Sequence, residues 1–104
     1  MGTNEPRLTQ QTLKVLGALI SGHVRELSGA DIAKLTQLSS GTLYPILYRL
    51  EQVGWVDSNW ELGDPALLGR PRRRYYRVTA EGARRVKEVV RELTPSNGRA
   101  VWAL

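Results

Sequence analysis

The chain has 104 residues, of which 41% are hydrophobic, so it has room for one small globular domain. It contains no cysteine, which excludes disulfides, cysteine-based zinc sites and thiol nucleophiles. Its net charge of +5 is unevenly distributed, because residues 1–69 carry five Lys or Arg against seven Asp or Glu, whereas residues 70–104 carry ten against three. A basic surplus in the last third of the chain favours a localised surface for nucleic acid over a solvated helix face or a basic tail.

The N-terminal segment predicts a leader followed by one helix. Residues 1–8 are polar and show no helical or strand periodicity, so we expect a flexible leader. A helical pattern begins at Thr9 and is ended by Gly22. The predicted apolar face consists of Leu13, Leu16, Leu19 and Ile20, with Val15 lying off it.

A capping pattern predicts a second, short helix. Ser28 precedes Asp31 by three residues, a spacing at which each side chain can bond the other residue's backbone N–H. The helix is expected to end near Gln37, and Leu27 before the cap is either a hydrophobic staple or part of a short strand. The residues expected to turn inward are Ile32, Ala33 and Leu35.

The third predicted helix runs from about Ser40 to Gln52, after a short turn, and offers a polar and aromatic surface to a ligand. Its predicted core face consists of Leu43, Ile46, Leu47, Leu50 and Val53. The opposite face and its flanks carry Gly41, Pro45, Tyr48 and Gln52, with Thr42, Tyr44 and Arg49.

The start of this third helix is the predicted reading end. A helix N-terminus exposes unpaired N–H groups and a partial positive charge, so Ser39, Ser40 and Thr42 are placed to meet phosphates or base edges. One of the two serines is also expected to cap the helix. Two alternatives stay open: Tyr44 and Tyr48 either contact the DNA backbone or pack on the rim of the domain, and Arg49 either binds DNA or pairs with Glu26.

Two alternating segments, Trp55–Trp60 and Arg73–Thr79, predict an antiparallel β-hairpin. The connection Glu61–Arg72 is too long and too rich in glycine and proline for a tight turn, so it predicts a protruding loop. A guanidinium group suits phosphate and a narrow minor groove, and Arg77 has the further option of pairing with an acidic neighbour. The five arginines predicted to bind DNA here are Arg70, Arg72, Arg73, Arg74 and Arg77.

A last helix is predicted from the Thr79 cap to about Leu93, and its apolar stripe packs either on the first helix or on a second chain. We expect a homodimer, because one small winged domain contacts few base pairs and operators are commonly palindromic. The apolar tail, with Val101, Trp102 and Leu104, either docks on a partner or is disordered. The expected dimer interface is Leu13, Leu16, Ala83, Val86, Val90 and Leu93, with Val15 as a further candidate.

Enzymatic chemistry is not indicated by the sequence. His23 is the only histidine, and no paired carboxylates, metal-ligand spacing or glycine-rich phosphate loop accompany it, so we expect no enzyme, no cofactor and no metal site. The longest apolar run, Val15–Ile20, is too short for a membrane span, which predicts a cytoplasmic protein. Trp55, Trp60 and Trp102 belong either to the core or to an aromatic effector pocket.

Two segments carry a resemblance to a known family. GTLYPILYRLEQVGWV, from Gly41 to Val56, and RRRYYRVTAEG, from Arg72 to Gly82, resemble the PadR family of winged-helix transcription regulators. The resemblance covers roughly residues 9–93 and implies a dimeric bacterial repressor that a small molecule or another signal releases from DNA. It makes Arg72 to Arg74 the wing, and it makes the reading end Ser40, Gly41, Thr42, Tyr44 and Pro45.

The chain departs from many members of that family at two places. Ser28 and Ala30 flank Gly29 where many members carry aromatic residues. No separate C-terminal helical domain is expected after Leu93, so the resemblance is to the short branch of the family.

The expected fold is mainly α-helical with a small antiparallel β-hairpin: a winged helix-turn-helix over residues 9–79, a C-terminal dimerisation helix over 80–93 and a tail over 94–104. The expected function is sequence-specific binding of double-stranded DNA as a homodimeric repressor on a palindromic operator, with an effector of unknown identity. The alternative is a winged helix that binds another protein and does not read DNA sequence.

Overall fold

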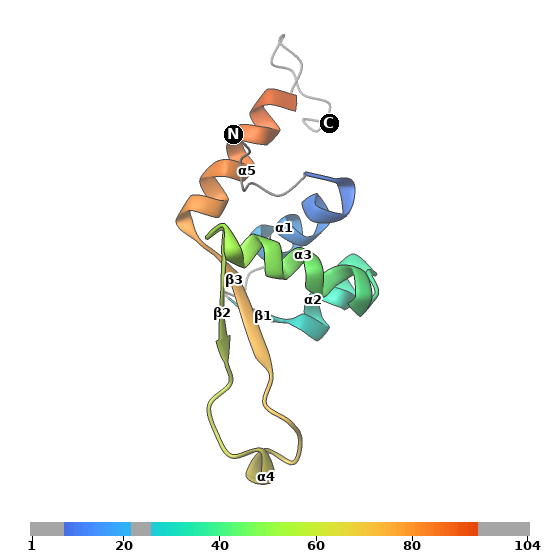
Figure 1. The fold of residues 1–104 in the computed structure, drawn as a ribbon, viewed down its shortest axis with the longest axis vertical. Helices are drawn as coiled ribbons and strands as arrows, with labels where there is room; N and C mark the ends of the chain where they lie inside the picture. The colour runs from blue at the N-terminus through green and yellow to red at the C-terminus, as the bar shows by residue number, and fades with distance from the viewer. Residues whose placement is uncertain (1–7, 22–25, 94–104) are drawn as a thin grey trace.

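The computed structural model describes residues 8–21 and 26–93, and it confirms the predicted fold class. The predictions for the leader, His23, the tail and Trp102 lie outside these residues. Figure 1 shows the longer helices gathered around one end of a hairpin whose other end, with one short helix at its tip, projects away from them. The elements in chain order are α1 (Gln10–Ser21), β1 (Leu27–Ser28), α2 (Gly29–Thr36), α3 (Ser40–Gln52), β2 (Val56–Trp60), α4 (Pro65–Leu68), β3 (Arg74–Val78) and α5 (Ala80–Leu93).

The sheet has three antiparallel strands in the order β1-β3-β2. Leu27 pairs with Tyr76, so the residue before the second helix forms part of a short strand, one of its two expected roles. Across the hairpin, Ser58 pairs with Tyr76 and Trp60 pairs with Arg74. Because side chains alternate across a strand, Ser58, Trp60, Arg74 and Tyr76 share one face of the sheet.

The core lies between α1, α2, α3 and the part of the sheet nearest to these helices, where Leu27, Val56 and Tyr76 are buried. The predicted inner face of α3 is confirmed for Leu43, Ile46, Leu47 and Leu50, all of them buried. Trp55, one of the possible effector-pocket residues, is 2% exposed and belongs to the core.

Two details of the predicted core are wrong. On α1 the buried face includes Val15, which is fully buried, whereas Ile20 is 42% exposed, so the face is rotated from the one expected. On α2 the inward residues are Ile32 and Thr36, which leaves Leu35 61% exposed. The helix has only eight residues, and the single turn from Ile32 to Thr36 makes its contact with the core. Leu35 lies on another face of the helix and therefore stays exposed.

The predicted capping of α2 is confirmed and fixes where this helix begins. The Asp31 N–H donates to Ser28 Oγ at 3.1 Å, and the Ser28 N–H donates to Asp31 Oδ2 at 3.1 Å. The helix ends at Gln37, whose φ of 62° is left-handed and turns the chain toward α3. Both ends of the short helix are therefore set by local bonds.

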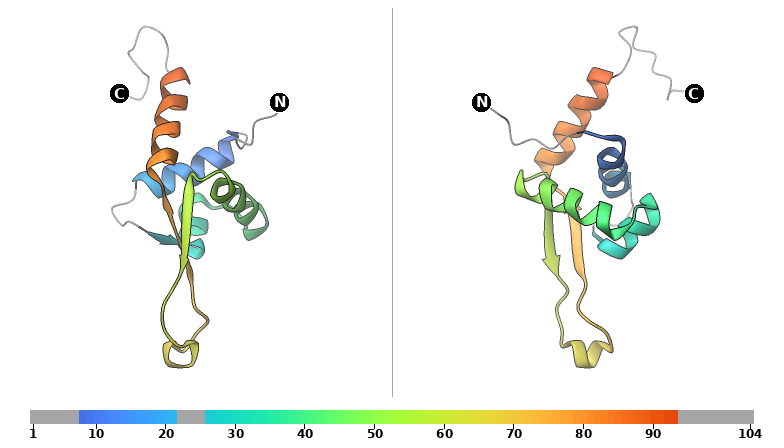
Figure 2. Two further views of the ribbon diagram at one scale, coloured as in Figure 1. Left: turned by 60° about the vertical axis from the view of Figure 1, so that its left-hand side comes forward. Right: turned by 45° about the vertical axis from the view of Figure 1, so that its right-hand side comes forward.

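The junction between the sheet and α5 is held by Thr79 and Gly82. The Gly82 N–H donates to Thr79 Oγ1 at 3.0 Å, which confirms the predicted cap, and the Thr79 hydroxyl donates to the Gly54 carbonyl at 2.7 Å. A Cβ on Gly82 would overlap the backbone carbonyl of Trp55. The close approach fixes the start of α5. Both views of Figure 2 show that helix leading away from the wing, by which we mean the hairpin of β2 and β3 with its connecting residues 61–73.

Candidate nucleic-acid interface

The N-terminal half of α3 presents the predicted reading end at the surface. Ser39, Ser40, Gly41 and Pro45 are exposed and Thr42 is half-buried, while Leu43 on the opposite side anchors the helix. The Ser39 side chain makes no capping bond to the backbone and instead donates to Thr42 Oγ1 at 3.3 Å. The first N–H groups of the helix have no intrahelical acceptor, so they remain available to a phosphate or a base edge.

Tyr44 and Tyr48 flank this end in different ways. Tyr48 is 64% exposed, and Tyr44 is 45% exposed. The Tyr44 hydroxyl lies so close to Gly29 that a Cβ on that glycine would overlap it. Tyr44 therefore connects α3 to the start of α2, and this contact holds its ring in place.

Arg49 is exposed and does not form the alternative pair with Glu26. It lines a hollow of about 320 Å³ together with Thr42 and Pro45 of α3 and Thr9 and Gln11 beside the start of α1. Its guanidinium group makes no hydrogen bond or ion pair with any described residue. A cation in this position extends the polar surface of the reading end.

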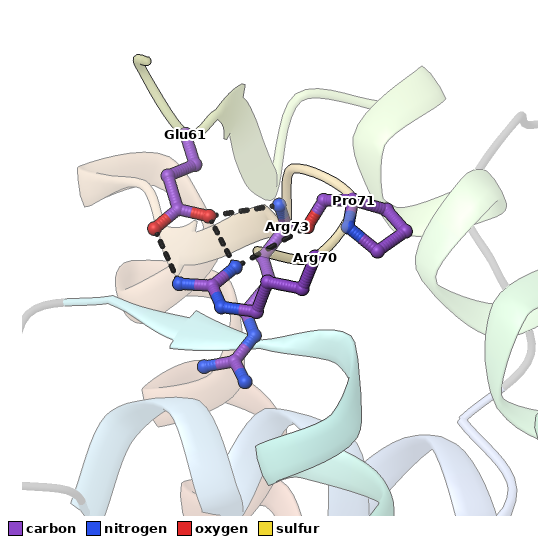
Figure 3. Close-up of polar contacts among 4 residues, drawn as sticks. All are labelled: Glu61, Arg70, Pro71 and Arg73. Carbon is purple, nitrogen blue, oxygen red and sulfur yellow. Dashed lines mark hydrogen bonds and ion pairs between the residues drawn. The ribbon is translucent and has the colours of Figure 1, made fainter. Parts of the chain in front are cut away.

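Arg70 is held inside the wing by Glu61. Its guanidinium donates to the two Glu61 carboxylate oxygens at 2.7 and 2.9 Å, and the Arg73 N–H donates to the same carboxylate at 3.1 Å (Figure 3). The Arg70 hydrogen bond is the main reason that the pKa of Glu61 is lowered from 4.5 to about 2, and the Arg73 N–H adds to it. Arg70 was predicted to bind DNA, whereas in the structure its guanidinium is bonded to Glu61 and closes the wing loop.

The Arg74 guanidinium is also bonded to side chains of the same chain. Its Nε donates to Ser58 Oγ at 2.9 Å, and its NH2 group lies 3.4 Å from Glu51 Oε1 near the end of α3. The guanidinium lies 5.4 Å from the centre of the Trp60 ring and 6.0 Å from that of Tyr76. Arg74 thus ties the wing to α3.

The remaining arginines of the wing differ in whether their guanidinium groups have a partner. Arg77 lies 3.7 Å from Asp57, and both side chains are about half exposed, so this is a weak surface pair of the kind expected as its alternative role. The guanidinium groups of Arg72 and Arg73 are exposed and make no hydrogen bond or ion pair with any described residue. Among the five arginines predicted to bind DNA, these two are the ones whose guanidinium groups have no hydrogen-bonded or ion-paired side chain within the described residues, although the charge of Arg73 helps to lower the pKa of Glu61.

Wing and helices meet at a hollow of about 420 Å³, which we call the wing-root hollow. Tyr44 comes from α3 and the guanidinium groups come from the wing, so the structure brings these two predicted parts of the site together. Sequence reasoning missed Glu51, Ser58 and Glu61, because their pairing with arginines depends on how the hairpin folds. The lining residues are Ser28, Gly29, Ala30, Tyr44, Trp60, Arg72, Arg73, Arg74 and Tyr76.

The predicted dimer residues fall into three groups. Leu16 is fully buried in the core of its own chain and has no surface to offer a partner, whereas Leu13 is half-buried. The side chain of Leu93 lies outside the described part of the structure. A third hollow of about 400 Å³, which we call the α5 groove, is lined by Ile20, Ala83, Val86, Lys87, Val90 and Arg91.

Two further features are absent from the described residues, a membrane-spanning helix and a metal-binding cluster. No helix within residues 8–21 and 26–93 is long and apolar enough to cross a membrane. The same residues contain no group of three or more His, Asp or Glu side chains placed to bind a metal ion.

Comparison with known proteins gives consistent matches. The family described as "Transcriptional regulator PadR-like family" matches residues 13–88. A PadR family transcriptional regulator from Eggerthella lenta DSM 2243 is 31% identical over 80% of this chain and 70% of that one, with a TM-score of 0.63. A PadR family regulator from Clostridium difficile R20291 is 25% identical over 81% of this chain and 86% of that one, with a TM-score of 0.65.

Bacillus subtilis PadR, solved in complex with operator DNA, shares the fold at 19% identity, with a TM-score of 0.65 over 83% of this chain. The present chain spans only about half of that protein, 49% of its length. No curated protein matches the chain in sequence. From the family match over residues 13–88 and the Eggerthella relative, the chain belongs to the PadR-like family of transcriptional regulators.

Proposed function

We propose that this chain is a sequence-specific regulator that binds double-stranded DNA. The observation that carries the proposal is the position of the Arg72 and Arg73 guanidinium groups around the same hollow as Tyr44 of α3. Neither group makes a hydrogen bond or ion pair with any described residue. A duplex laid along α3 would meet both the helix N-terminus and these cations. Operator binding by the structurally similar B. subtilis PadR supports this assignment.

The two parts of the surface have different roles in this proposal. The exposed start of α3 enters the major groove, where small residues allow close approach to base edges. Tyr44, Tyr48 and Arg49 contact the DNA backbone on either side of it. The residues of the reading end are Ser39, Ser40, Gly41, Thr42 and Pro45.

The wing supplies most of the electrostatic attraction. Arg72 and Arg73 bind phosphates or the minor groove, and Arg77 adds a weaker contact because its charge is shared with Asp57. Arg70 and Arg74 are structural in this assignment, since each is bonded to a glutamate of the same chain. This division makes the helix responsible for sequence and the wing for affinity.

We also propose that the protein acts as a homodimeric repressor on a palindromic operator. The α5 groove supports the dimer, because it leaves Ile20 42% exposed and Val90 38% exposed on one apolar surface. Two copies joined there would present two reading helices to two half-sites. The interface proposed is Leu13, Ile20, Ala83, Val86, Val90 and Leu93, without the buried Leu16.

The test is a comparison of two labelled duplexes by fluorescence anisotropy. One is the DNA upstream of the protein's own gene, searched for an inverted repeat, and the other carries the same bases in shuffled order. A specific regulator should bind the first about a thousandfold more tightly or better at physiological salt. Equal affinity for both would reduce the protein to a nonspecific DNA binder.

One observation favours a second candidate, a winged helix that binds another protein. At the tip of the wing, Leu62 is 88% exposed and Leu67 is 87% exposed. Exposed leucines of this kind are typical of a contact surface. Failure to bind either duplex, together with loss of a protein partner on changing both leucines to serine, would favour this candidate.

A further inference from the structure

The far end of the wing, residues 62–69, is apolar and exposed, and we call it the wing tip. Figure 1 shows its single-turn helix α4 at the end of the wing farthest from the other helices. Leu62 is 88% exposed and Leu67 is 87% exposed, so neither contributes much to the core of its own chain. A further hollow of about 590 Å³ beside this helix is lined by Trp60, Pro65, Pro71 and Arg72.

Local hydrogen bonds hold the wing tip in one shape. The Ala66 N–H donates to Asp64 Oδ1 at 2.9 Å, and the Leu67 N–H donates to the Asp64 carbonyl at 2.9 Å. The turn ends at Gly69, whose φ of 73° is left-handed and whose N–H donates to the Pro65 carbonyl at 2.9 Å. The two exposed leucines are therefore carried by an ordered turn.

The wing tip begins directly beyond the cations that the proposed function assigns to DNA. The Glu61 N–H donates to the Arg73 carbonyl at 2.7 Å, and the Arg73 N–H returns a bond of 3.1 Å to the Glu61 carboxylate. Only residues 62–64 separate this pair from α4, and three residues extend at most about 11 Å. The minor groove of DNA is about 7.5 Å deep. With Arg73 on a backbone phosphate, the leucines are within reach of the groove floor.

The wing tip is too wide for an undistorted minor groove. A helical turn with its side chains is about 10–12 Å across, whereas the minor groove of B-form DNA is about 6 Å wide. Proteins that open this groove insert apolar side chains, leucine among them, between two base pairs, which kinks the duplex and widens the groove. The exposed leucines at the end of the wing have the chemistry that such insertion requires.

The charges of the wing favour DNA over a protein as the partner of these leucines. Glu61 and Arg70 are bonded to each other, which leaves Arg72 and Arg73 near the sheet and Asp64 at the tip. A duplex uses both features of the wing at once, with phosphates on the two arginines and the groove around the leucines. Phosphates repel Asp64, so burial of apolar surface has to draw the tip into the groove.

We propose that Leu62 and Leu67 enter the minor groove beside the half-site read by α3, separate one base step and bend the duplex. The inference rests on the proposed function, because it requires a bound duplex. It adds a second source of specificity, since pyrimidine–purine steps such as TA and CA are the easiest to unstack. The protein would select such a step beneath the wing tip without a hydrogen bond to its bases.

Energy transfer between dyes at the two ends of the duplex used above measures the bend, and anisotropy of the same duplex measures binding. The wild-type protein should bend the bound duplex by roughly 20–90°. The double variant Leu62→Ser/Leu67→Ser should still bind and should lose the bend. Leu67→Met is the matched control, because it keeps an apolar side chain of similar volume, and should keep the bend. A straight duplex on the wild type, or an unchanged bend on the double serine variant, would overturn the proposal.

A change in the DNA tests the same contact from the other side. Replacing the pyrimidine–purine steps that flank the repeat with a stiff A-tract should weaken binding to the wild type about tenfold. Binding to the double serine variant should not change, because it no longer unstacks a step. An equal loss of affinity in both proteins would show that the flanking steps do not act through the leucines.

Asp64→Ser tests whether the wing tip lies against phosphates. Serine keeps a hydroxyl oxygen for the cap of α4 and removes the negative charge. Affinity for the duplex should rise, by up to about fivefold at low salt. An unchanged affinity at low salt would place the tip away from the DNA and contradict the proposal.

The same measurements separate this proposal from the proposed function. If no duplex binds to the wild-type protein, both fail. If the upstream duplex binds in preference to the shuffled one but stays straight, the proposed function stands and only the inserted wing tip fails. If the double serine variant loses a protein partner while the bend is unchanged, the leucines form a protein contact and the proposal is overturned.

Discussion

The Arg70 guanidinium donates two hydrogen bonds, 2.7 and 2.9 Å long, to the carboxylate of Glu61 across the loop of the wing. Arg72 and Arg73 follow Arg70 with only Pro71 between, so the position of their backbone depends on this pair. The Arg73 N–H donates to the same carboxylate, which fixes the chain on the far side of Pro71. An ion pair inside the wing thereby orients the two cations assigned to DNA.

The first prediction concerns the protonation of Glu61. Its pKa is lowered to about 2 by the hydrogen bond from Arg70 and the N–H of Arg73, so a carboxyl carbon titration by NMR should show its midpoint near that pH. A depressed pKa means that the pair contributes stability above the ordinary value of 4.5 and loses it as the pH falls toward 2.

Arg70→Gln tests the cause of this shift. The midpoint of Glu61 should rise but stay below 4.5, because the backbone N–H of Arg73 still donates to the carboxylate. Arg77→Gln, at the weak pair with Asp57, is the control and should leave the midpoint of Glu61 in place. An unchanged midpoint in Arg70→Gln would contradict the bidentate pair.

The second prediction concerns salt dependence. If Arg72 and Arg73 each neutralise one phosphate, changing both to alanine should make the slope of log affinity against log salt less negative by about 1.8, or about 0.9 per phosphate. The paired control changes Arg84 of α5 and Lys34 of α2, two exposed cations that line neither the wing-root hollow nor the α5 groove, to alanine. Anisotropy titrations at four salt concentrations give both slopes, and equal slopes in the two double variants would refute the wing assignment.

Local sequence patterns predicted most of the fold. The third helix was predicted to run from about Ser40 to Gln52 and does so, because its start signal and its apolar period agree. The Ser28 capping box and the Thr79 cap were also predicted, since both depend on residues three apart. The short helix Pro65–Leu68 was missed, because a four-residue turn has no period to detect.

Pairings between distant residues were beyond such patterns. Five arginines in eight residues indicated a polyanion-binding wing. Two of them are bonded to glutamates instead: Arg70 binds Glu61, 9 residues away along the chain, and Arg74 binds Glu51, 23 residues away. Likewise, the exposure of Leu35 depends on how α2 meets the core, which a helical period alone does not set. The sequence therefore predicted the elements of the candidate site better than the availability of its charges.

The third prediction concerns Gly82. A methyl group there would overlap the Trp55 carbonyl, and backbone does not move aside easily, so Gly82→Ala should lower the free energy of unfolding by about 1–3 kcal/mol. Gly17→Ala is a matched control, since a Cβ at this exposed position of α1 meets nothing within 4 Å. It should stabilise the protein by about 0.5–1 kcal/mol through helix propensity.

Urea denaturation monitored by circular dichroism measures both glycine variants. The opposite signs of the two changes make the pair informative, since a general effect of adding a methyl group would move both in one direction. A Gly82→Ala protein as stable as the wild type would show that the α5 junction has room that the structure does not show.

The fourth prediction concerns the dimer. Val90 lies on the α5 groove at 38% exposure, so Val90→Glu places a charge in the proposed interface while leaving the core of each chain intact. Light scattering at micromolar concentration should find a dimer for the wild type and a monomer for this variant, because removing a carboxylate from water costs more free energy than pairing it with Lys87 or Arg91 of the groove returns. Leu67→Glu makes a similar change at the wing tip, where the leucine is 87% exposed, and should stay dimeric.

Affinity for a duplex with two half-sites should fall in Val90→Glu, whereas affinity for a single half-site should not, because each reading helix is unchanged. A wild-type protein that is monomeric under these conditions would remove α5 as the dimerisation element and leave its groove without the occupant proposed for it.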